Sequence, residues 1–427
     1  MERSVRWLLL RVLVAASAAV ALVVSAIAPA SATTPVTSVR ANEWWLTAMH
    51  APDVIWPRST GVGITVAIID SGVNANHPDL VGQVLPGQNF SALSGGSNVD
   101  ADGHGTGMAS FIAGTGKGLN GQGMYGLAPG AKILPLRVNG VGDNELAFST
   151  SLAEQLTKAI RAAADSNAQI INISMAEIEN ESNVHSAIDY ALARGKLIIA
   201  GVGNDGTNGN PLEYPAAFPG VVGVGETTPQ SNVATESEHG PQVALVAPGG
   251  GMVQDCVGPS GYCTSHGTSD STAIVSASAA LIWSVHPTWT ANQIIRVMIN
   301  TANHANVTPG NTNPYTGYGV VRPRIALVTP GDPGAADVNP LIPVAATQSA
   351  ASQASAAAAT SPNGSALKAG AKTGGDSTSW IVVAIAVVAI ILIAVVVALI
   401  LIRRRNRPGP PPSSDPNPND PYAHLPD

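Results

Sequence analysis

Charged residues are scarce in this chain, and cysteines are scarcer. Asp, Glu, Lys and Arg make up 11% of its 427 residues, and the formal net charge is -7. Apart from one group of arginines near the C-terminus there is no long basic run, which argues against nucleic acid as a partner. No zinc or phosphate motif occurs, and no acidic group has the ligand spacing that would assign a calcium site. The sequence therefore predicts no cofactor and no metal.

Long apolar runs are confined to the two ends of the chain. Residues 1–32 combine three early arginines with an apolar run over 12–28 and end in Ala30-Ser31-Ala32. This is the pattern of a secretory signal peptide with its cleavage site. The second run, 380–402, would form a helix of about 34 Å, long enough to cross a bilayer. Arginines follow at 403, 404, 405 and 407, and by the positive-inside rule they lie in the cytoplasm.

These two runs predict a single-pass protein of the cell membrane, with residues 33–379 outside the cytoplasm. A buried core helix is the alternative for the second run. Cys256 and Cys263 fall on the exported side, where an oxidising environment favours a disulfide between them. Residues 33–60 form a short extension with three tryptophans. Residues 329–379 have the Ala, Ser, Pro, Gly and Thr composition of a flexible stalk, and the tail over 403–427 is basic and then proline-rich.

Between these segments, residues 61–328 show apolar strands that alternate with helices. The predicted buried strands occupy 63–69, 133–138, 169–174, 196–200, 221–224 and 243–246. The predicted helices occupy 151–164, 182–194 and 290–301, and Ser151 and Glu154 have the spacing of a capping box. This alternation predicts an α/β domain in three layers, with helices on both faces of a mostly parallel sheet.

Ser269 lies where a glycine-containing loop becomes a helix of small residues. Unpaired backbone N–H groups and the positive end of the helix dipole would stabilise an oxyanion at such a position. A helix cap is the alternative role, because serine is favoured there. Asp70 ends the strand 63–69, and His104 opens a helix between two glycines. Taken alone, Asp70 could equally be a turn residue and His104 a structural histidine.

Together, Asp70, His104 and Ser269 supply what amide hydrolysis needs: an acid that orients a base, the base, and a nucleophile. The side-chain amide of Asn204, which follows the strand 196–200, could donate to the oxyanion with the backbone N–H of Ser269. The chain order Asp, His, Ser is the subtilisin order.

Over residues 60–328 the chain resembles the subtilisin-like serine proteases. The matching segments, in the family's order, are Val66 to Val73, His77-Pro78-Asp79-Leu80, Gly103-His104-Gly105-Thr106, Gly126 to Pro129, Asn172-Ile173-Ser174, Gly203-Asn204, Tyr214-Pro215-Ala216, Ala247-Pro248-Gly249, Gly267-Thr268-Ser269 and His286-Pro287. The resemblance implies that Asp70 orients His104 as base and acid for the nucleophile Ser269. It implies that Asn204 belongs to the oxyanion hole. It also implies that an extended peptide pairs with the cleft segment Ser174, Met175, Ala176 and Glu177.

Several positions depart from the family pattern. Ala273 replaces a proline, which makes the start of the helix less rigid but removes no catalytic group. Asp270 could oppose the oxyanion, or it could point outward and complement the helix dipole. Ala176 and Glu177 could narrow the cleft and favour a basic substrate residue. His266 is expected to be part of the cleft wall.

The whole architecture resembles the mycosins, the membrane-anchored proteases of type VII secretion systems. That resemblance implies an extension that wraps the domain rather than a removable pro-domain. It also implies the membrane and a secretion-system complex as partners. We expect a serine endopeptidase that cuts exported proteins. The alternatives are a scaffold of a secretion complex with dispensable proteolysis, and a broad cell-surface protease.

Overall fold

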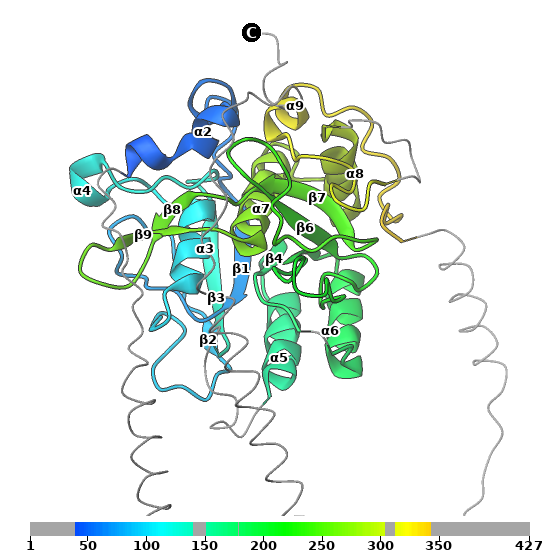
Figure 1. Ribbon diagram of the computed structural model, residues 1–427, viewed down its shortest axis with the longest axis horizontal. Helices are drawn as coiled ribbons and strands as arrows, with labels where there is room; N and C mark the ends of the chain where they lie inside the picture. Colours follow the sequence, from blue (N-terminus) through cyan, green and yellow to red (C-terminus); the bar gives the residue numbers. More distant parts are fainter. Residues whose placement is uncertain (1–38, 140–150, 178, 304–311, 343–427) are drawn as a thin grey trace, which may run out of the picture. The chain divides into compact units, whose positions relative to one another are not determined.

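A seven-stranded sheet forms the centre of the domain (Figure 1). The computed structural model describes residues 39–139, 151–177, 179–303 and 312–342. The strand order is β2-β3-β1-β4-β5-β6-β7, and every neighbouring pair is parallel, as predicted. The strands are β1 (Thr65–Asp70), β2 (Gln88–Asn89), β3 (Lys132–Arg137), β4 (Ile170–Ile173), β5 (Leu197–Gly201), β6 (Val222–Thr227) and β7 (Val243–Pro248).

The helices begin and end close to the predicted residues. Ser151 caps α5 by accepting a hydrogen bond of 3.3 Å from the N–H of Glu154, and Thr290 forms a capping box with Gln293 at the start of α8. The helical elements are η1 (Arg40–Asn42), α2 (Trp44–Ala48), η2 (Ala51–Ile55), α3 (His104–Ala113), α4 (Gly118–Gly121), α5 (Leu152–Asp165), α6 (Ser182–Ala193), α7 (Thr268–Val285), α8 (Ala291–Thr301) and α9 (Pro323–Val328).

Successive residues of β1 face opposite sides of the sheet, and each side has its own apolar core. Val66 and Ile68 pack in the core that contains α3 and α7, whereas Ala67 and Ile69 pack in the core that contains α5 and α6. Figure 1 shows α5 and α6 side by side. Because both faces of a parallel sheet must be covered, this arrangement gives three layers.

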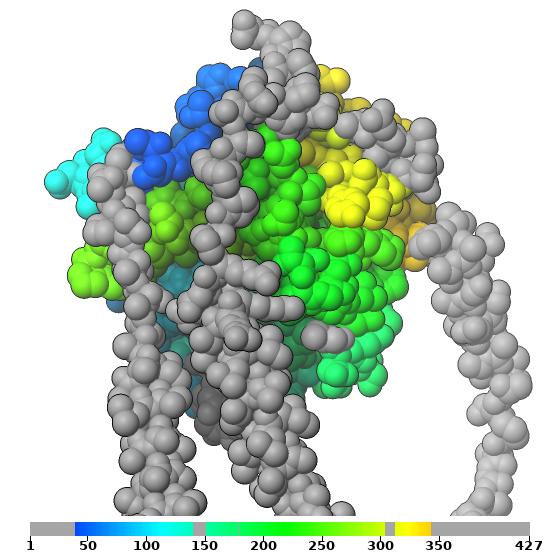
Figure 2. Space-filling model, in the orientation of Figure 1, coloured from blue at the N-terminus to red at the C-terminus, as the bar shows by residue number. Residues whose placement is uncertain are grey.

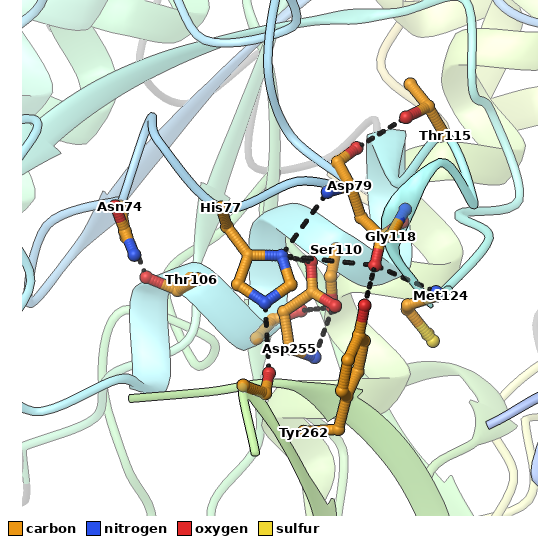
Figure 3. Close-up of polar contacts among 12 residues, drawn as sticks. Asn74, His77, Asp79, Thr106, Ser110, Thr115, Gly118, Met124, Asp255 and Tyr262 are labelled. Atoms are coloured by element: carbon orange, nitrogen blue, oxygen red, sulfur yellow. Dashed lines mark hydrogen bonds and ion pairs between the residues drawn. The ribbon is translucent and has the colours of Figure 1, made fainter. Parts of the chain in front are cut away.

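An antiparallel hairpin of β8 (Met252–Asp255) and β9 (Tyr262–Ser265) stands apart from the sheet. A buried polar cluster ties it to the domain (Figure 3). Nδ1 of His77 lies 2.9 Å from Oδ2 of Asp255, and Nε2 of His77 lies 3.0 Å from the carbonyl oxygen of Gly261. The hydroxyl of Tyr262 donates to Asp79 at 2.8 Å. His77 and Asp79, which follow β1 in the sequence, thus anchor the hairpin to the domain.

The extension packs closely on the domain from residue 39 onward. Trp45 is fully buried, and its ring lies edge-on to Phe111 with centroids 6.0 Å apart. Trp56 donates from Nε1 to the carbonyl oxygen of Leu127 at 3.0 Å. Figure 2 shows this segment in blue on the surface of the domain, and η2 contacts α9.

The chain stays on the domain after α9, as far as residue 342. Gln293 of α8 donates to the carbonyl oxygen of Gly334 at 2.9 Å, and Thr290 donates to that of Ala336 at 2.8 Å. The first part of the predicted stalk, residues 329–342, therefore lies against α8. The signal peptide, the rest of the stalk, the apolar run 380–402 and the tail lie outside the described residues. Within the described ranges, no helix has both the length and the apolar character needed to cross a membrane.

Candidate active site

Asp70 and His104 meet at the carboxyl end of β1. Asp70 ends the strand and His104 begins α3, and Nδ1 of His104 lies 2.8 Å from Oδ1 of Asp70. The carboxylate is buried, whereas 23% of the His104 side chain is exposed. Gly105 permits this approach of helix to strand, because a Cβ there would lie 2.1 Å from the carbonyl oxygen of Gly72. The imidazole is therefore held by Asp70 and stays accessible from solvent.

Asp100 fixes the turn between these two residues, and sequence reasoning missed it. This buried carboxylate accepts hydrogen bonds from the N–H groups of Gly103 and Thr106 at 2.8 and 2.9 Å and from the hydroxyls of Thr106 and Ser71 at 2.6 and 3.0 Å. Because these donors come from both sides of the Asp70–His104 pair, Asp100 sets their relative position. Gly103 and Thr106 are near Asp100 in the sequence, but Ser71 is 29 residues away, so no local spacing signals that Asp100 joins the two segments.

Ser269 is the second residue of α7. The N-cap is Gly267, whose φ of 135° favours glycine, and no side chain caps the helix. The alternative that Ser269 is the helix cap is therefore wrong. Its hydroxyl donates to the carbonyl oxygen of Ser174 at 3.2 Å, and in the described part of the chain no hydrogen bond joins it to His104. Rotation about one side-chain bond exchanges such partners, and catalytic hydrogen bonds often tighten only when substrate binds.

Asn204 follows β5 in the sequence and lies against the first turn of α7, the helix that carries Ser269. Its Oδ1 accepts a hydrogen bond of 2.9 Å from the N–H of Thr268. Because the oxygen is used in this way, the amide nitrogen is left as a donor, and Asn204 is exposed. An exposed side-chain N–H donor thus lies at the first turn of α7, the turn that carries Ser269.

Two carboxyl groups lie behind this donor. A Cβ on Gly203, whose φ is 110°, would come within 2.5 Å of Oε2 of Glu213 and 2.6 Å of Oε1 of Glu238. Burial raises the pKa of both groups, that of Glu238 to about 8. Glycine before Asn204 is required by this crowding as well as by the backbone angle.

The four residues of the predicted cleft segment, 174–177, have different roles. The hydroxyl of Ser174 donates to the carbonyl oxygen of Ser269 at 3.2 Å, which fixes the segment against α7. Met175 is buried in the core, so its side chain does not line a surface cleft. Ala176 and Glu177 are half-buried, and Glu177 forms an antiparallel bridge with Tyr214.

Asp270 lies in the first turn of α7 but does not point outward. It is 2% exposed, and its Oδ2 accepts a hydrogen bond of 2.5 Å from the hydroxyl of Ser265. Burial raises the pKa of Asp270 to about 7, against the lowering by that hydrogen bond and by the charge of His104. The expectation of an outward carboxylate is therefore wrong, because the hairpin strand β9 covers this side of α7. Ala273 is also buried in α7.

The same carboxylates control His104. Burial alone would lower the pKa of His104, but the charge of Asp70 and its hydrogen bond outweigh burial, with further help from Asp270 and Asp102. The result is a pKa of about 9. Because a general base must be neutral before it accepts a proton, this site suits alkaline conditions.

Two groups of side chains in the described residues have the make-up of metal ligands. One is His77, Asp79 and Asp255, and the other is Glu226, Glu236 and His266. In the first group Asp79 already accepts hydrogen bonds from the N–H groups of Gly118 and Met124 and from Tyr262. Sequence spacing did not reveal either group, because each combines residues from distant strands and loops.

Cys256 and Cys263 lie close together in the hairpin as half-buried thiols. A hydrogen bond between them lowers the pKa of Cys263 to about 7 and raises that of Cys256. Their proximity is what the predicted disulfide needs, and the disulfide remains a prediction.

Comparison with known proteins agrees with this geometry. The fold is that of a subtilisin-like serine protease. Residues 61–320 match the Peptidase_S8 model of the subtilase family, and the chain belongs to this family of serine proteases. Alkaline elastase YaB of Bacillus sp. (strain YaB) is 32% identical over 292 residues, which cover 68% of this chain and 71% of the relative. Subtilisin Savinase of Lederbergia lenta is 31% identical over 66% of this chain and 97% of its own.

Solved structures of mycosins are similar as well. MycP1 of the ESX-1 type VII secretion system matches with a TM-score of 0.60 and 26% identity, covering 72% of this chain and 91% of that one. MycP1 from Mycobacterium smegmatis gives 0.59 and 26%, over 72% and 89% of the two chains. MycP3 of the ESX-3 system gives 0.57 and 30%, over 70% and 90%.

Proposed function

We propose that Asp70, His104, Ser269 and Asn204 form the catalytic apparatus of a serine endopeptidase. The observation that carries the proposal is the His104–Asp70 pair, 2.8 Å apart and partly open to solvent, in the same site as a serine at a helix start. Ser269 Oγ attacks the scissile carbonyl and passes its proton to Nε2 of His104. Asp70 orients the imidazole and stabilises its positive charge.

The oxyanion that forms meets donors already in place. The side-chain oxygen of Asn204 accepts a hydrogen bond from the N–H of Thr268, which fixes the orientation of the amide. Its N–H groups therefore need no reorganisation to bind the oxyanion. The backbone N–H of Ser269 adds a second donor at the positive end of α7. His104 then returns the proton to the leaving amine, and water repeats the sequence on the acyl-enzyme.

The substrate of this mechanism is an extended peptide. Ser174 and Glu177 lie on a segment that leaves β4 beside Ser269, and backbone groups there pair with a peptide in the manner of an added strand. Only the side chains of Ala176 and Glu177 contribute surface, because Ser174 and Met175 are buried.

We further propose that the protease is anchored in the cell membrane by residues 380–402 and acts outside the cytoplasm on proteins exported by a type VII secretion system. The apolar run and its flanking arginines support the anchor. The similarity to MycP1 and MycP3, proteases of the ESX-1 and ESX-3 type VII secretion systems, supports the link to secretion. A scaffold of the secretion complex is the second candidate, favoured by the close packing of the extension on the domain.

The experiment compares cells that carry the full chain with cells that carry Ser269→Ala. Mass spectrometry of exported proteins is expected to find new N-termini only with the active chain. To test the membrane orientation, a protease is added to intact cells, and it is expected to digest the domain but not the arginine-containing tail. Normal secretion in cells that carry Ser269→Ala, together with impaired secretion in cells that lack the protein, would favour the scaffold role. Identical N-termini in both strains would contradict the proteolytic role.

A further inference from the structure

A cavity of about 450 Å³ opens beside the nucleophile. Its wall includes Ser265 and His266, which directly precede the N-cap Gly267 of α7. Gly267 is two residues from Ser269, so at most about 7.6 Å separate their Cα atoms. The opposite wall comes from Glu226 at the end of β6 and from Glu236. A peptide held at Ser269 therefore passes close to this cavity.

The cavity has an excess of acidic side chains. Glu226 is fully buried, and among the described residues no side chain bonds to its carboxylate, which has only the backbone N–H of Gly267 close enough to lower its pKa. Glu236 is at the rim, 35% exposed, and a ligand atom from each of Glu226, Glu236 and His266 lies within 4.8 Å of the other two. None of the described residues that line the cavity is Lys or Arg.

This arrangement changes the pKa of Glu226. Burial, and then the charges of Glu236 and Asp270, raise the pKa of Glu226 to about 8. A buried carboxyl without a side-chain partner is unfavourable, and a cation that donates hydrogen bonds would satisfy it. His266 is a weak internal substitute, because its side chain is 71% exposed and its Nδ1 lies 3.5 Å from Glu236.

We propose that this cavity binds the basic side chain of a substrate residue close to the scissile bond, with Glu226 as its floor and Glu236 as its rim. The inference rests on the proposed protease function. A lysine or arginine side chain suits the site better than a bare metal ion for two reasons. The volume is many times that of one water, about 30 Å³. Among the described residues, the second ring nitrogen of His266 also has no partner of the kind that orients metal-binding histidines.

The test digests a peptide library with the purified full chain and reads the residues on both sides of every cut. We expect Lys and Arg to be enriched about tenfold at one position near the cut, the gain typical of one charge-assisted hydrogen bond. Glu236→Gln is expected to remove most of that enrichment, and Glu236→Lys to favour acidic residues there. Glu181→Gln, an exposed acid at the start of α6, is the matched control and leaves the profile unchanged.

Five results would overturn the inference. Peptides could be cut with no basic preference, which leaves the protease function intact. The preference could persist in both Glu236 variants, or it could disappear in Glu177→Gln instead, which would place it in the segment after β4. Cutting could require added zinc and stop with a chelator, which would assign the cavity to a metal. If no peptide is cut and a fluorophosphonate does not label Ser269, the proposed function fails and the inference with it.

Discussion

Two His–Asp pairs with almost the same geometry occur in this domain, and they differ in what surrounds them. In one, Nδ1 of His104 lies 2.8 Å from Asp70, and in the other Nδ1 of His77 lies 2.9 Å from Asp255. The second nitrogen of His77 faces the carbonyl oxygen of Gly261, and the side chain is only 5% exposed. His104 has no such partner on its other nitrogen in the described part of the chain, and its side chain is 23% exposed.

The difference shows that a His–Asp pair is not in itself a catalytic device. The pair at His77 is closed on every side by protein, so it can only stabilise the hairpin β8–β9 (Figure 3). Asp255 and Asp79 raise the pKa of His77 although burial alone would lower it, so the ion pair is favoured in place. The pair at His104 keeps one nitrogen for a substrate and a serine.

Replacing the aspartate in each pair should separate the two roles most strongly. Asp70→Asn is expected to lower kcat by about 10,000-fold with little loss of folding, because Asn selects the wrong imidazole tautomer. Asp255→Asn is expected to keep kcat within about threefold and to lower the free energy of unfolding by about 1 to 3 kcal/mol. Peptide hydrolysis and urea unfolding measure the two effects. A folded Asp255→Asn protein without activity would contradict the distinction.

The oxyanion donor should give the next largest effect. Asn204→Ala is expected to lower kcat about 100- to 1,000-fold with KM nearly unchanged, because its hydrogen bond forms mainly in the transition state. Asn208→Ala, at an exposed position in the same loop, is the control and should stay within twofold of wild type. A parallel rise in KM would instead make Asn204 a binding residue.

The His104–Asp70 pair also differs from the His77–Asp255 pair in the nearby charge of Asp270, which raises the pKa of His104. Because Asp270 helps to raise the pKa of His104 to about 9, activity should rise with pH up to that region, where the imidazole becomes neutral. Asp270→Asn should move the midpoint of this rise to lower pH, and Asp189→Asn, an exposed change on α6, should not. The measurement is kcat/KM against pH for the three proteins. A profile that does not move would remove Asp270 from the control of the base.

Stability should depend on pH in the opposite sense, and more weakly. Burial raises the pKa of Asp255 and Asp270 to about 7 and that of Glu226 and Glu238 to about 8, from ordinary values of 3.8 and 4.5. Between about pH 5 and 8 the folded state thus holds more protons than the unfolded state, and the free energy of unfolding falls as pH rises. Urea unfolding of Ser269→Ala, which cannot digest itself, measures this slope. A free energy that rises over the same interval would contradict the burial of these acids.

The sequence was most informative where the signals were local. The strand before Asp70, the cap at Ser151 and the glycines around His104 each predicted local structure that the fold contains. Asp100, Glu226 and Asp255 could not be found in this way, because the residues that give them their roles, among them Ser71, Glu236 and His77, come close only in the fold. The orientation of Asp270 failed for the same reason, since β9 covers it.

Composition also misled at the C-terminal boundary. Residues 329–342 have few apolar side chains, so the sequence assigned them to a stalk. They are held by hydrogen bonds from Thr290, Gln293 and Asn292 to backbone carbonyl groups, an interaction that side-chain composition does not reveal. Such contacts depend on the exposed face of α8 rather than on the segment itself.

Covalent labelling with a fluorophosphonate tests the central claim most directly, that Ser269 is a nucleophile activated by His104. The full chain is labelled in parallel with Ser269→Ala, His104→Ala and His77→Gln, the last being the closed pair's matched variant. The account predicts labelling of wild type and of His77→Gln at similar rates, and none of the other two. Labelling that persists in Ser269→Ala, or a folded wild-type protein that takes up no probe, would contradict it.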